Sequence, residues 1–360
     1  MKIGVGMVGA GLMGAVHSFM LKKIASFSDI DLELVAIADM DKSKLAGFAA
    51  GFGYKETYAD YKRITSHPDV NVIYITTPTV YHKEILKEAV SKGKHVFCEK
   101  PLAFTAQEAQ DMLDSTLKAG VKHQVGLVLR YSPTFNVIKD FLSNDLGFPM
   151  TVLFRDDQVF PIKGVHNTPW RGDVKSAGGG TIIEHSIHDV DMLTWLFGPI
   201  MRLEAKLDNL AGVNGIEDRA VVWFEFESGM TATLVSLWHD VLKRESCRLI
   251  EIFFERAYLA TDEDFLGTVK VQLGDNILKT ISRDDVFTCY IDKAGINRMH
   301  ADELGRVPYG FEDLAFIKAI IEGRQPEPGL EVAVAAHKII DAIYESANKR
   351  SPIYLNEKDL

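Results

Sequence analysis

One segment of the chain, Glu99-Lys100-Pro101, places a lysine where it could transfer a proton. The segment follows an apolar run at residues 95–98, and a strand that ends in Lys-Pro stops abruptly with the ammonium group at its end. A partly desolvated lysine loses its proton more readily and can take part in proton transfer. The alternative interpretation is a surface lysine whose charge pairs with Glu99. Lys100 is therefore a candidate catalytic residue, and this segment alone does not separate the two interpretations.

A second segment, residues 178–199, carries three polar side chains that favour acid–base chemistry. Glu184, His188 and Asp191 lie at positions i, i+4 and i+7 of an expected helix, so they share one face. The adjoining stripe is apolar and is expected to face the core; it comprises Ile183, Ile187 and Val190. The polar face suits proton transfer and the recognition of hydroxyl groups. A solvated face and a Glu184–His188 metal pair are the alternatives, although no further ligand cluster is evident and no metal is expected.

A glycine pattern near the start of the chain predicts a dinucleotide site. Gly9-Ala10-Gly11-Leu12-Met13-Gly14 has the G-x-G-x-x-G spacing between an apolar run and an expected helix. Glycines let the backbone turn tightly and approach a pyrophosphate, which binds at the helix N-terminus. Asp39 lies 25 residues after Gly14 and can accept hydrogen bonds from ribose hydroxyls. Because its carboxylate would repel a 2′-phosphate, NAD is favoured, while Lys42 and Lys44 keep NADP possible. The alternative is a glycine-rich turn without a ligand.

These residues need elements that bring them together, and the first third of the chain alternates strand and helix patterns. The expected strands are residues 3–8, 32–38, 71–76, 95–98 and 122–127, and the expected helices are residues 12–26, 81–92 and 106–118. Thr105 and Glu108 form a capping box at the last helix. This succession predicts an α/β Rossmann domain over residues 1–127. Ligands bind beyond the carboxyl ends of such strands, where the candidate residues are Thr77, Pro78, His82, Glu99 and Lys100.

The rest of the chain, residues 128–360, is expected to form an α+β domain with a large, mostly antiparallel open sheet. Strand patterns follow one another at residues 150–160, 202–210, 219–227, 231–239, 248–260, 268–273 and 277–282, with turn signals at 227–229 and 274–276. Closing helices are expected over about residues 310–348. Residues 221–224 and 252–254 are apolar at successive positions, so both sheet faces should be buried. A homodimer or homotetramer formed through this sheet is therefore predicted.

Composition excludes several classes of protein. With 47% hydrophobic and 25% charged residues among 360, the chain is neither disordered nor of low complexity. Its net charge of -10 disfavours nucleic acid as a partner. The sequence also contains no run of 18 apolar residues, the length that a membrane-spanning helix needs. The three cysteines have no paired spacing, which fits a reducing, cytoplasmic location. A signal peptide at the start is not expected, because the apolar stretch there holds five glycines.

Taken together, these motifs resemble the Gfo/Idh/MocA oxidoreductases, typified by glucose-fructose oxidoreductase and inositol dehydrogenase. The resemblance covers essentially the whole chain. It is carried by residues 9–14, Asp39, Thr77-Pro78 with His82, residues 94–102, Trp170-Arg171, residues 178–180, residues 188–191 and the tail from Phe316 to Ala347. It implies a Rossmann domain, a second domain that contacts the substrate, and assembly into dimers or tetramers.

The resemblance also implies roles for individual residues. A lysine, a carboxylate and a histidine four residues later surround the reacting carbon, and the matching positions are Lys100, Glu184 and His188. Asp191 matches a substrate-contacting aspartate of the inositol-type enzymes. Glu184 departs from the family, where aspartate is commoner, and its extra methylene moves the carboxylate outward. We favour His188 as base and Lys100 as the group polarising the oxygen, and the reverse stays open. Further candidates for substrate contacts are Arg130, His166, Trp170, Arg171, Trp238 and His239.

The expected activity is hydride transfer between NAD(P) and a secondary alcohol of a sugar, sugar derivative or cyclic polyol. The expected partners are thus a small-molecule substrate and a second copy of the chain, with no nucleic acid and no membrane. Two alternatives remain. One is an NAD-assisted glycosidase or lyase, which oxidises its sugar transiently. The other is a sugar- or nucleotide-sensing regulator on the same scaffold, which would need neither Lys100 nor His188.

Overall fold

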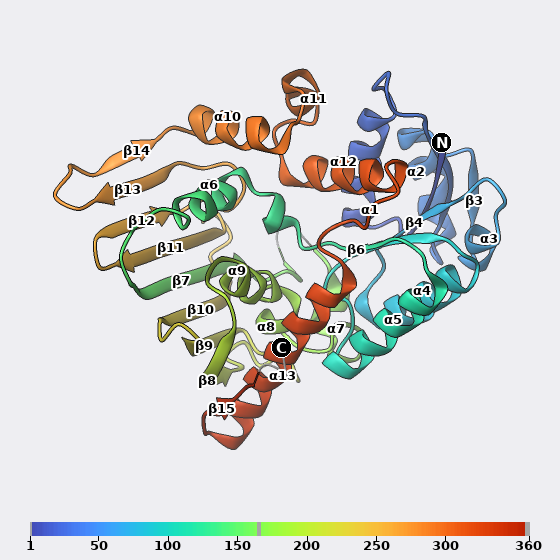
Figure 1. The fold of residues 1–360 in the computed structure, drawn as a ribbon. Helices are drawn as coiled ribbons and strands as arrows, with labels where there is room; N and C mark the ends of the chain where they lie inside the picture. The colour runs from blue at the N-terminus through green and yellow to red at the C-terminus, as the bar shows by residue number, and fades with distance from the viewer. Residues whose placement is uncertain (1, 164–166, 357–360) are drawn as a thin grey trace. The chain divides into compact units, whose positions relative to one another are not determined.

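Two compact units make up the chain in the computed structural model, which describes residues 2–163 and 167–356 (Figure 1). The first unit contains Met1–Val128 and Arg298–Val334, and the second contains Leu129–Asn297 and Ala335–Leu360. The sequence pattern places a single boundary between residues 127 and 128. The structure instead groups residues 298–334 with the first unit, because α12 (Pro308–Ile321) packs against α1 (Leu12–Ile24).

The first unit contains a six-stranded parallel sheet, which confirms the predicted Rossmann architecture. The strand order is β3-β2-β1-β4-β5-β6. The strands are β1 (Ile3–Val8), β2 (Leu32–Ala38), β3 (Glu56–Tyr58), β4 (Val72–Ile75), β5 (His95–Cys98) and β6 (His123–Val125). The other helices of this unit are α2 (Lys42–Phe52), α3 (Lys62–Thr65), η1 (Thr79–Tyr81), α4 (His82–Ser91), α5 (Ala106–Ala119) and α11 (Arg298–Glu303). Strands β1 and β4 are buried at every position, as expected for parallel strands with helices on both faces.

The start of α5 illustrates how local sequence sets an element boundary. Thr105 Oγ1 accepts the backbone N–H of Glu108 at 3.2 Å. The Glu108 carboxylate reaches back to the backbone N–H of Phe104, also at 3.2 Å. Gly120 ends the helix with a φ of +66°, which glycine adopts without strain. The predicted cap at Thr105 is confirmed, and the reciprocal contact lies one residue earlier than a standard capping box.

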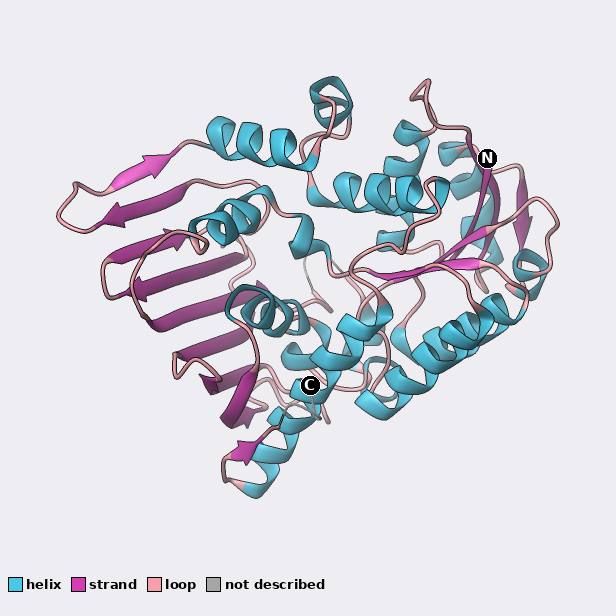
Figure 2. Cartoon of the chain, viewed as in Figure 1, coloured by secondary structure: helices cyan, strands magenta, loops and turns pink. Residues whose placement is uncertain are grey.

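The second unit is built on a nine-stranded sheet, seen as the long array of strands in Figure 2. Its strands are β7 (Pro149–Val159), β8 (Ile200–Asp208), β9 (Arg219–Phe226), β10 (Thr231–His239), β11 (Cys247–Phe254), β12 (Ala257–Thr261), β13 (Val269–Leu273), β14 (Lys279–Ile281) and β15 (Ile353–Tyr354). The order is β14-β13-β12-β11-β7-β10-β9-β8-β15, and β7 and β10 alone are parallel neighbours. The predicted, mostly antiparallel sheet is therefore confirmed.

The sheet differs from a simple meander in two places. Strand β7 lies between β10 and β11, although a long helical segment and the strands β8 and β9 separate it from β10 in sequence. The expected single strand over residues 248–260 is wrong, because the chain reverses at Glu255-Arg256 and forms the β11–β12 hairpin. This turn contains neither Gly, Pro nor Asn, so the usual turn signals are missing from the sequence.

Helices cover one face of this sheet, and the other face remains partly exposed. Even-numbered residues of β7 and β10 point to the covered face, where α6 (Pro133–Phe141) and α9 (Ile187–Phe197) lie (Figure 1). The remaining helices of the unit are η3 (Pro169–Gly172), α7 (Val174–Ala177), α8 (Thr181–Glu184) and α10 (Arg283–Ala294), and η2 (Val128–Tyr131) lies at its start. On the opposite face, Leu153, Val221 and Phe253 are 45%, 41% and 36% exposed.

The last helix, α13 (Leu330–Lys349), contributes to the cores of both units. Leu330 and Ala333 pack in the core of the first unit, and Ile339 and Ile343 pack in that of the second. The expected closing helices over residues 310–348 therefore correspond to α12 and α13. Within the described ranges, no helix combines the length and apolar character that crossing a bilayer requires.

Candidate active site

The turn between β1 and α1 requires glycine at two positions. Gly9 has a φ of +112°, and a Cβ there would lie 2.8 Å from the backbone of Thr76. A Cβ on Gly14 would lie 2.1 Å from the carbonyl oxygen of Gly9. Gly11 faces open space, and no side chain caps the first turn of α1. The backbone amides at the start of this helix are thus suited to an anionic group such as a pyrophosphate.

Asp39 lies at the end of β2, beside this turn. Its Oδ2 accepts the backbone N–H of Ala10 at 2.7 Å, and its Oδ1 accepts that of Asp41 at 2.8 Å. The two bonds fix the orientation of the carboxylate relative to the glycine turn. Each oxygen retains lone pairs for ribose hydroxyls. The geometry therefore fits the predicted contact with the adenosine ribose.

Thr77, Pro78 and His82 gather at the carboxyl end of β4. The Thr77 hydroxyl is buried and has no hydrogen-bond partner within the described parts of the chain, and Pro78 precedes η1. His82 is also buried, with Nε2 2.9 Å from the Thr77 carbonyl and Nδ1 3.0 Å from that of Pro101. His82 thus links the ends of β4 and β5 through backbone groups, and Thr77 offers an unused polar atom. The exposed Leu12 and the half-buried Met13 open α1 in the same unit.

Glu99 and Lys100 follow β5 directly. Glu99 is buried, and its Oε2 accepts the backbone N–H of Lys100 at 3.0 Å. Its Oε1 lies 2.9 Å from Nε2 of His17, a residue of α1. Glu99 thus contacts the backbone amide of Lys100. The side chain of Lys100 is only partly buried.

The helix expected across Glu184, His188 and Asp191 is interrupted, so that prediction is wrong. Glu184 ends α8, and His188 lies in the first turn of α9. At the break, the backbone N–H of Ser186 bonds to the carbonyl of Thr181, five residues back. The Ser186 hydroxyl also donates to Ser236 on β10 at 2.6 Å. This tertiary contact and the wide turn override the helical periodicity.

Each of the two predicted carboxylates of this segment is buried against an arginine. Arg171 Nε donates to Glu184 Oε2 at 2.9 Å. Arg130 binds Asp191 through two nitrogens, with Nε 2.9 Å from Oδ2 and Nη2 2.7 Å from Oδ1. Burial raises the pKa of Asp191, and Arg130 partly offsets this rise. Because His188 is buried as well, these residues do not form a solvated helix face.

The remaining substrate candidates occupy different places. The guanidinium carbon of Arg171 lies 4.4 Å from the centre of the Trp170 ring, so these two side chains form one aromatic–cationic surface. Trp238 is buried against Phe160 on the helix-covered face of the sheet. His239 follows it on the opposite face, with Nε2 3.7 Å from Asp157. The structure therefore does not bring His239 together with His188. His166 lies outside the described residues.

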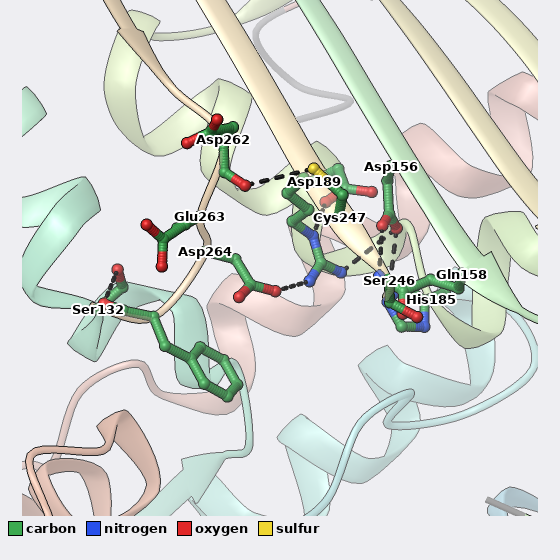
Figure 3. Close-up of polar contacts among 12 residues, drawn as sticks. Ser132, Asp156, Gln158, His185, Asp189, Ser246, Cys247, Asp262, Glu263 and Asp264 are labelled. Atoms are coloured by element: carbon green, nitrogen blue, oxygen red, sulfur yellow. Dashed lines mark hydrogen bonds and ion pairs between the residues drawn. The ribbon is translucent and has the colours of Figure 1, made fainter. Parts of the chain in front are cut away.

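A buried charge cluster anchors the first turn of α9, and sequence reasoning missed it (Figure 3). Arg248 on β11 binds Asp189 at 2.7 Å, Asp156 at 3.3 Å and Asp264 at 2.7 Å. Burial raises the pKa of Asp156 well above its usual range; Arg248 opposes this rise and Asp189 adds to it. His185, at the α8–α9 break, has Nε2 3.5 Å from Asp156. This cluster holds the residue next to His188 against the sheet.

Across residues 2–163 and 167–356, no group of three or more His, Cys, Asp or Glu side chains is placed to hold a metal ion. Glu184 and Asp191 instead have arginine partners.

Two family profiles match most of the chain. The profile described as the oxidoreductase family with an NAD-binding Rossmann fold matches residues 3–127. The profile of the GFO/IDH/MocA C-terminal domain matches residues 140–260. The chain belongs to the Gfo/Idh/MocA oxidoreductase family. As a member of this family, it is an NAD-dependent oxidoreductase, and the glycine turn and Asp39 have the geometry that this cofactor needs.

Relatives of known activity align over nearly the whole length of this Gfo/Idh/MocA protein. Levoglucosan dehydrogenase of Pseudarthrobacter phenanthrenivorans is 26% identical, and the alignment covers 97% of each chain. Inositol 2-dehydrogenase of Rhizobium meliloti is 24% identical over 98% of this chain and 99% of the relative. A solved structure of levoglucosan dehydrogenase with NADH and levoglucosan has a TM-score of 0.86 at 23% identity, covering 99% and 100% of the two chains. This likeness shows a shared fold.

Some residues that shape the site of this Gfo/Idh/MocA protein carry only weak sequence signals. Arg248 occupies an inward position of a strand whose next inward positions are Ile250 and Ile252. A charged residue at such a position indicates a buried partner, but the sequence does not say which one. His17 has a similar signal, because it lies among apolar residues of α1 directly after the glycine turn.

Proposed function

We propose that this chain is an NAD-dependent dehydrogenase that oxidises a secondary alcohol of a sugar, a sugar derivative or a cyclic polyol. The observations that carry the proposal are a complete dinucleotide turn and Lys100 in the first unit, together with the buried residues Glu184, bound to an arginine, and His188 in the second unit. The names of the full-length relatives support this substrate class, since they act on levoglucosan and inositol.

In the first unit, the chain's task is to bind and orient the dinucleotide. The amides after Gly11 receive the pyrophosphate, and Asp39 accepts hydrogen bonds from the adenosine ribose. The buried Thr77 hydroxyl, which has no partner within the described residues, is a further proposed contact to the same cofactor. The nicotinamide, when bound, supplies the hydride acceptor.

In the second unit, His188 is the proposed base and Glu184 its partner. Arg171 holds the Glu184 carboxylate in place. His188 takes the hydroxyl proton. The role proposed for Lys100, in the first unit, is to polarise a substrate oxygen through its ammonium group. Trp170, stacked with Arg171, offers an apolar face to the C–H surface of a sugar ring.

The first test is nicotinamide absorbance of the purified protein with NAD and then NADP. The substrate panel contains inositols, aldoses, sugar acids and anhydrosugars. Reduction of the nicotinamide by one class of compound identifies the substrate class. A preference for NAD over NADP supports the role of Asp39. No reduction across the panel, with NAD binding confirmed by titration, would contradict the proposal. Glycosides and product analysis would then examine transient oxidation, the reaction of an NAD-assisted glycosidase.

We further propose that the exposed face of the large sheet forms a homodimer or homotetramer contact. Leu153, Val221 and Phe253 lie on three different strands and expose apolar surface on this one face. Partly exposed apolar residues on neighbouring strands are typical of a contact between protein surfaces. A second copy of the chain supplies an identical sheet face, so the contact can be self-complementary.

The location proposed for the enzyme is cytoplasmic. Cys98, Cys247 and Cys289 are free thiols in the described structure, and Cys98 is buried. Unpaired cysteines are typical of reducing compartments. Detection of the native protein in a cytosolic fraction checks this proposal.

A further inference from the structure

A buried imidazole of the first unit contacts two carboxylates at once. His17 on α1 is fully buried, and its Nδ1 lies 2.9 and 3.1 Å from the two carboxylate oxygens of Asp313 on α12. Its Nε2 lies 2.9 Å from Oε1 of Glu99. A neutral imidazole carries one N–H and can donate to only one of these groups. Hydrogen bonds to both carboxylates therefore require the imidazolium form.

The surroundings of His17 favour this charge. Burial opposes it, but Asp313 and Glu99 raise the pKa of His17 well above its usual range. Burial also raises the pKa of Asp313, and the His17 imidazolium partly offsets that rise. The other ring neighbours are aromatic; they are Tyr74, Phe97 and Tyr309. The charged groups that face His17 from β5 and α12 are thus carboxyls.

A third carboxyl, Glu312, borders the same group from α12. It is fully buried, and neither of its oxygens has a hydrogen-bond partner within the described ranges. Burial raises the pKa of Glu312 well above its usual range, although His17 opposes this. A protonated Glu312 leaves Glu99 and Asp313 as two anions around one imidazolium.

Glu99 links this imidazolium to Lys100. One of its oxygens faces His17, and the other accepts the Lys100 backbone N–H at 3.0 Å. Burial opposes ionisation of Glu99, but the hydrogen bond from His17 and the positive charges of His17 and Lys100 lower its pKa. The carboxylate is also confined, because a Cβ on Gly126 would lie 3.0 Å from it. Its charge and its position therefore both depend on His17.

We propose that His17 is a positioning residue for Lys100. Through Glu99 it holds the end of β5 against α1, the helix that begins at the glycine turn, and it maintains an anion beside the lysine. The inference rests on the proposed function, in which Lys100 acts on the substrate oxygen. A simple structural cross-link would change stability alone, whereas a positioning role also changes the protonation of Lys100.

The decisive test uses His17→Gln, which keeps an amide donor and removes the charge. Competitive acetylation of the full-length protein across a range of pH, quantified by mass spectrometry, reports the midpoint pH at which Lys100 becomes reactive. Without the imidazolium, buried Glu99 takes up a proton, and the ammonium group loses its anionic neighbour. We expect the midpoint to fall by about 1 pH unit. An unchanged midpoint overturns the proposal.

Ser18→Ala is the matched control. Ser18 is the next residue of α1, is fully buried and lies 2.8 Å from the Tyr54 hydroxyl. Its replacement disturbs the same helix without touching Glu99. The acetylation midpoint of Lys100 should stay at the wild-type value. An equal shift in both variants would mean that any disturbance of α1 acts on Lys100, and would reject a specific role for His17.

Glu99→Gln provides a second variant that keeps the shape of the side chain, in case His17→Gln does not fold. It should lower the midpoint in the same direction, and an unchanged midpoint again rejects the proposal. With substrate, either variant should lower kcat about tenfold or more, with a smaller change in the KM for NAD. Because acetylation needs no substrate, failure of the sugar panel would reject the proposed function and leave this test intact.

Discussion

Arg171 binds Glu184 through one Nε–H···O bond of 2.9 Å, although the two side chains differ in exposure. The Glu184 side chain is inaccessible, whereas that of Arg171 is 19% exposed and stacks on Trp170. The arginine is therefore a counter-ion that allows the Glu184 carboxylate to remain buried.

Replacing Arg171 by methionine should destabilise the protein and lower its activity. Removing one partner of a buried ion pair costs about 3 kcal/mol, because the remaining charge loses its compensation. Urea unfolding measures this loss, and kcat measures the effect on the site. Arg283→Met is the control, since Arg283 pairs with Glu263 at the exposed surface and should change stability by less than about 1 kcal/mol. Equal effects of the two substitutions would contradict the assignment.

Lys100→Met should lower kcat by about 100-fold or more, because methionine fills similar space without a proton or a charge. Binding of NAD, measured by titration, should change far less. Lys118→Met, on the exposed end of α5, is the control and should retain wild-type turnover. Retained turnover in the Lys100 variant would remove this lysine from the mechanism.

Asp39→Ala should weaken NAD binding about tenfold or more and narrow the preference for NAD over NADP. The substitution removes the acceptor for the ribose hydroxyls and the charge that repels a 2′-phosphate. It also removes the bond to the Ala10 amide, so the glycine turn loses one support. Titration with both reduced cofactors checks the prediction. Unaltered cofactor affinities would show that Asp39 does not contact the ribose.

Val221→Glu, on the exposed face of the large sheet, should dissociate the proposed oligomer. Two copies would bring the new carboxylates together in an apolar contact, which is costly. Sedimentation velocity at micromolar concentration measures the outcome. Ile277→Glu is the control, because Ile277 is highly exposed near the β13–β14 turn. A monomeric wild type, or dissociation by the control alone, would contradict the proposed contact.

The stability difference between the wild type and His17→Gln should depend on pH. The folded-state pKa of His17 is raised above its unfolded value, so the imidazolium stabilises the fold fully below about pH 6.5. This contribution disappears as the pH rises through the folded-state pKa. Thermal unfolding from pH 6 into the alkaline range should therefore show a shrinking difference. A difference that grows with pH would mean that His17 is buried in its neutral form.

The local patterns of the chain predict most of the first unit. The bounds of β1 and β2 follow directly from apolar runs ended by glycine or aspartate, and the cap at Thr105 follows from its own sequence. Glycines with a positive φ or a close backbone neighbour are required by local geometry, so the dinucleotide turn is also visible in the sequence. The polar side chains within residues 184–191 can also be recognised in the sequence. Their burial and their packing partners cannot.

Local sequence patterns were enough to predict the Rossmann unit, the mostly antiparallel second sheet and the candidate residues. These depend on short-range periodicity, turn chemistry and motif spacing, which neighbouring residues encode. The helix break at Ser186, the insertion of β7 between β10 and β11, and the partners of His17 and Arg248 became visible in the folded chain. Each of these depends on contacts between residues far apart in the chain, where burial and charge pairing outweigh local preference.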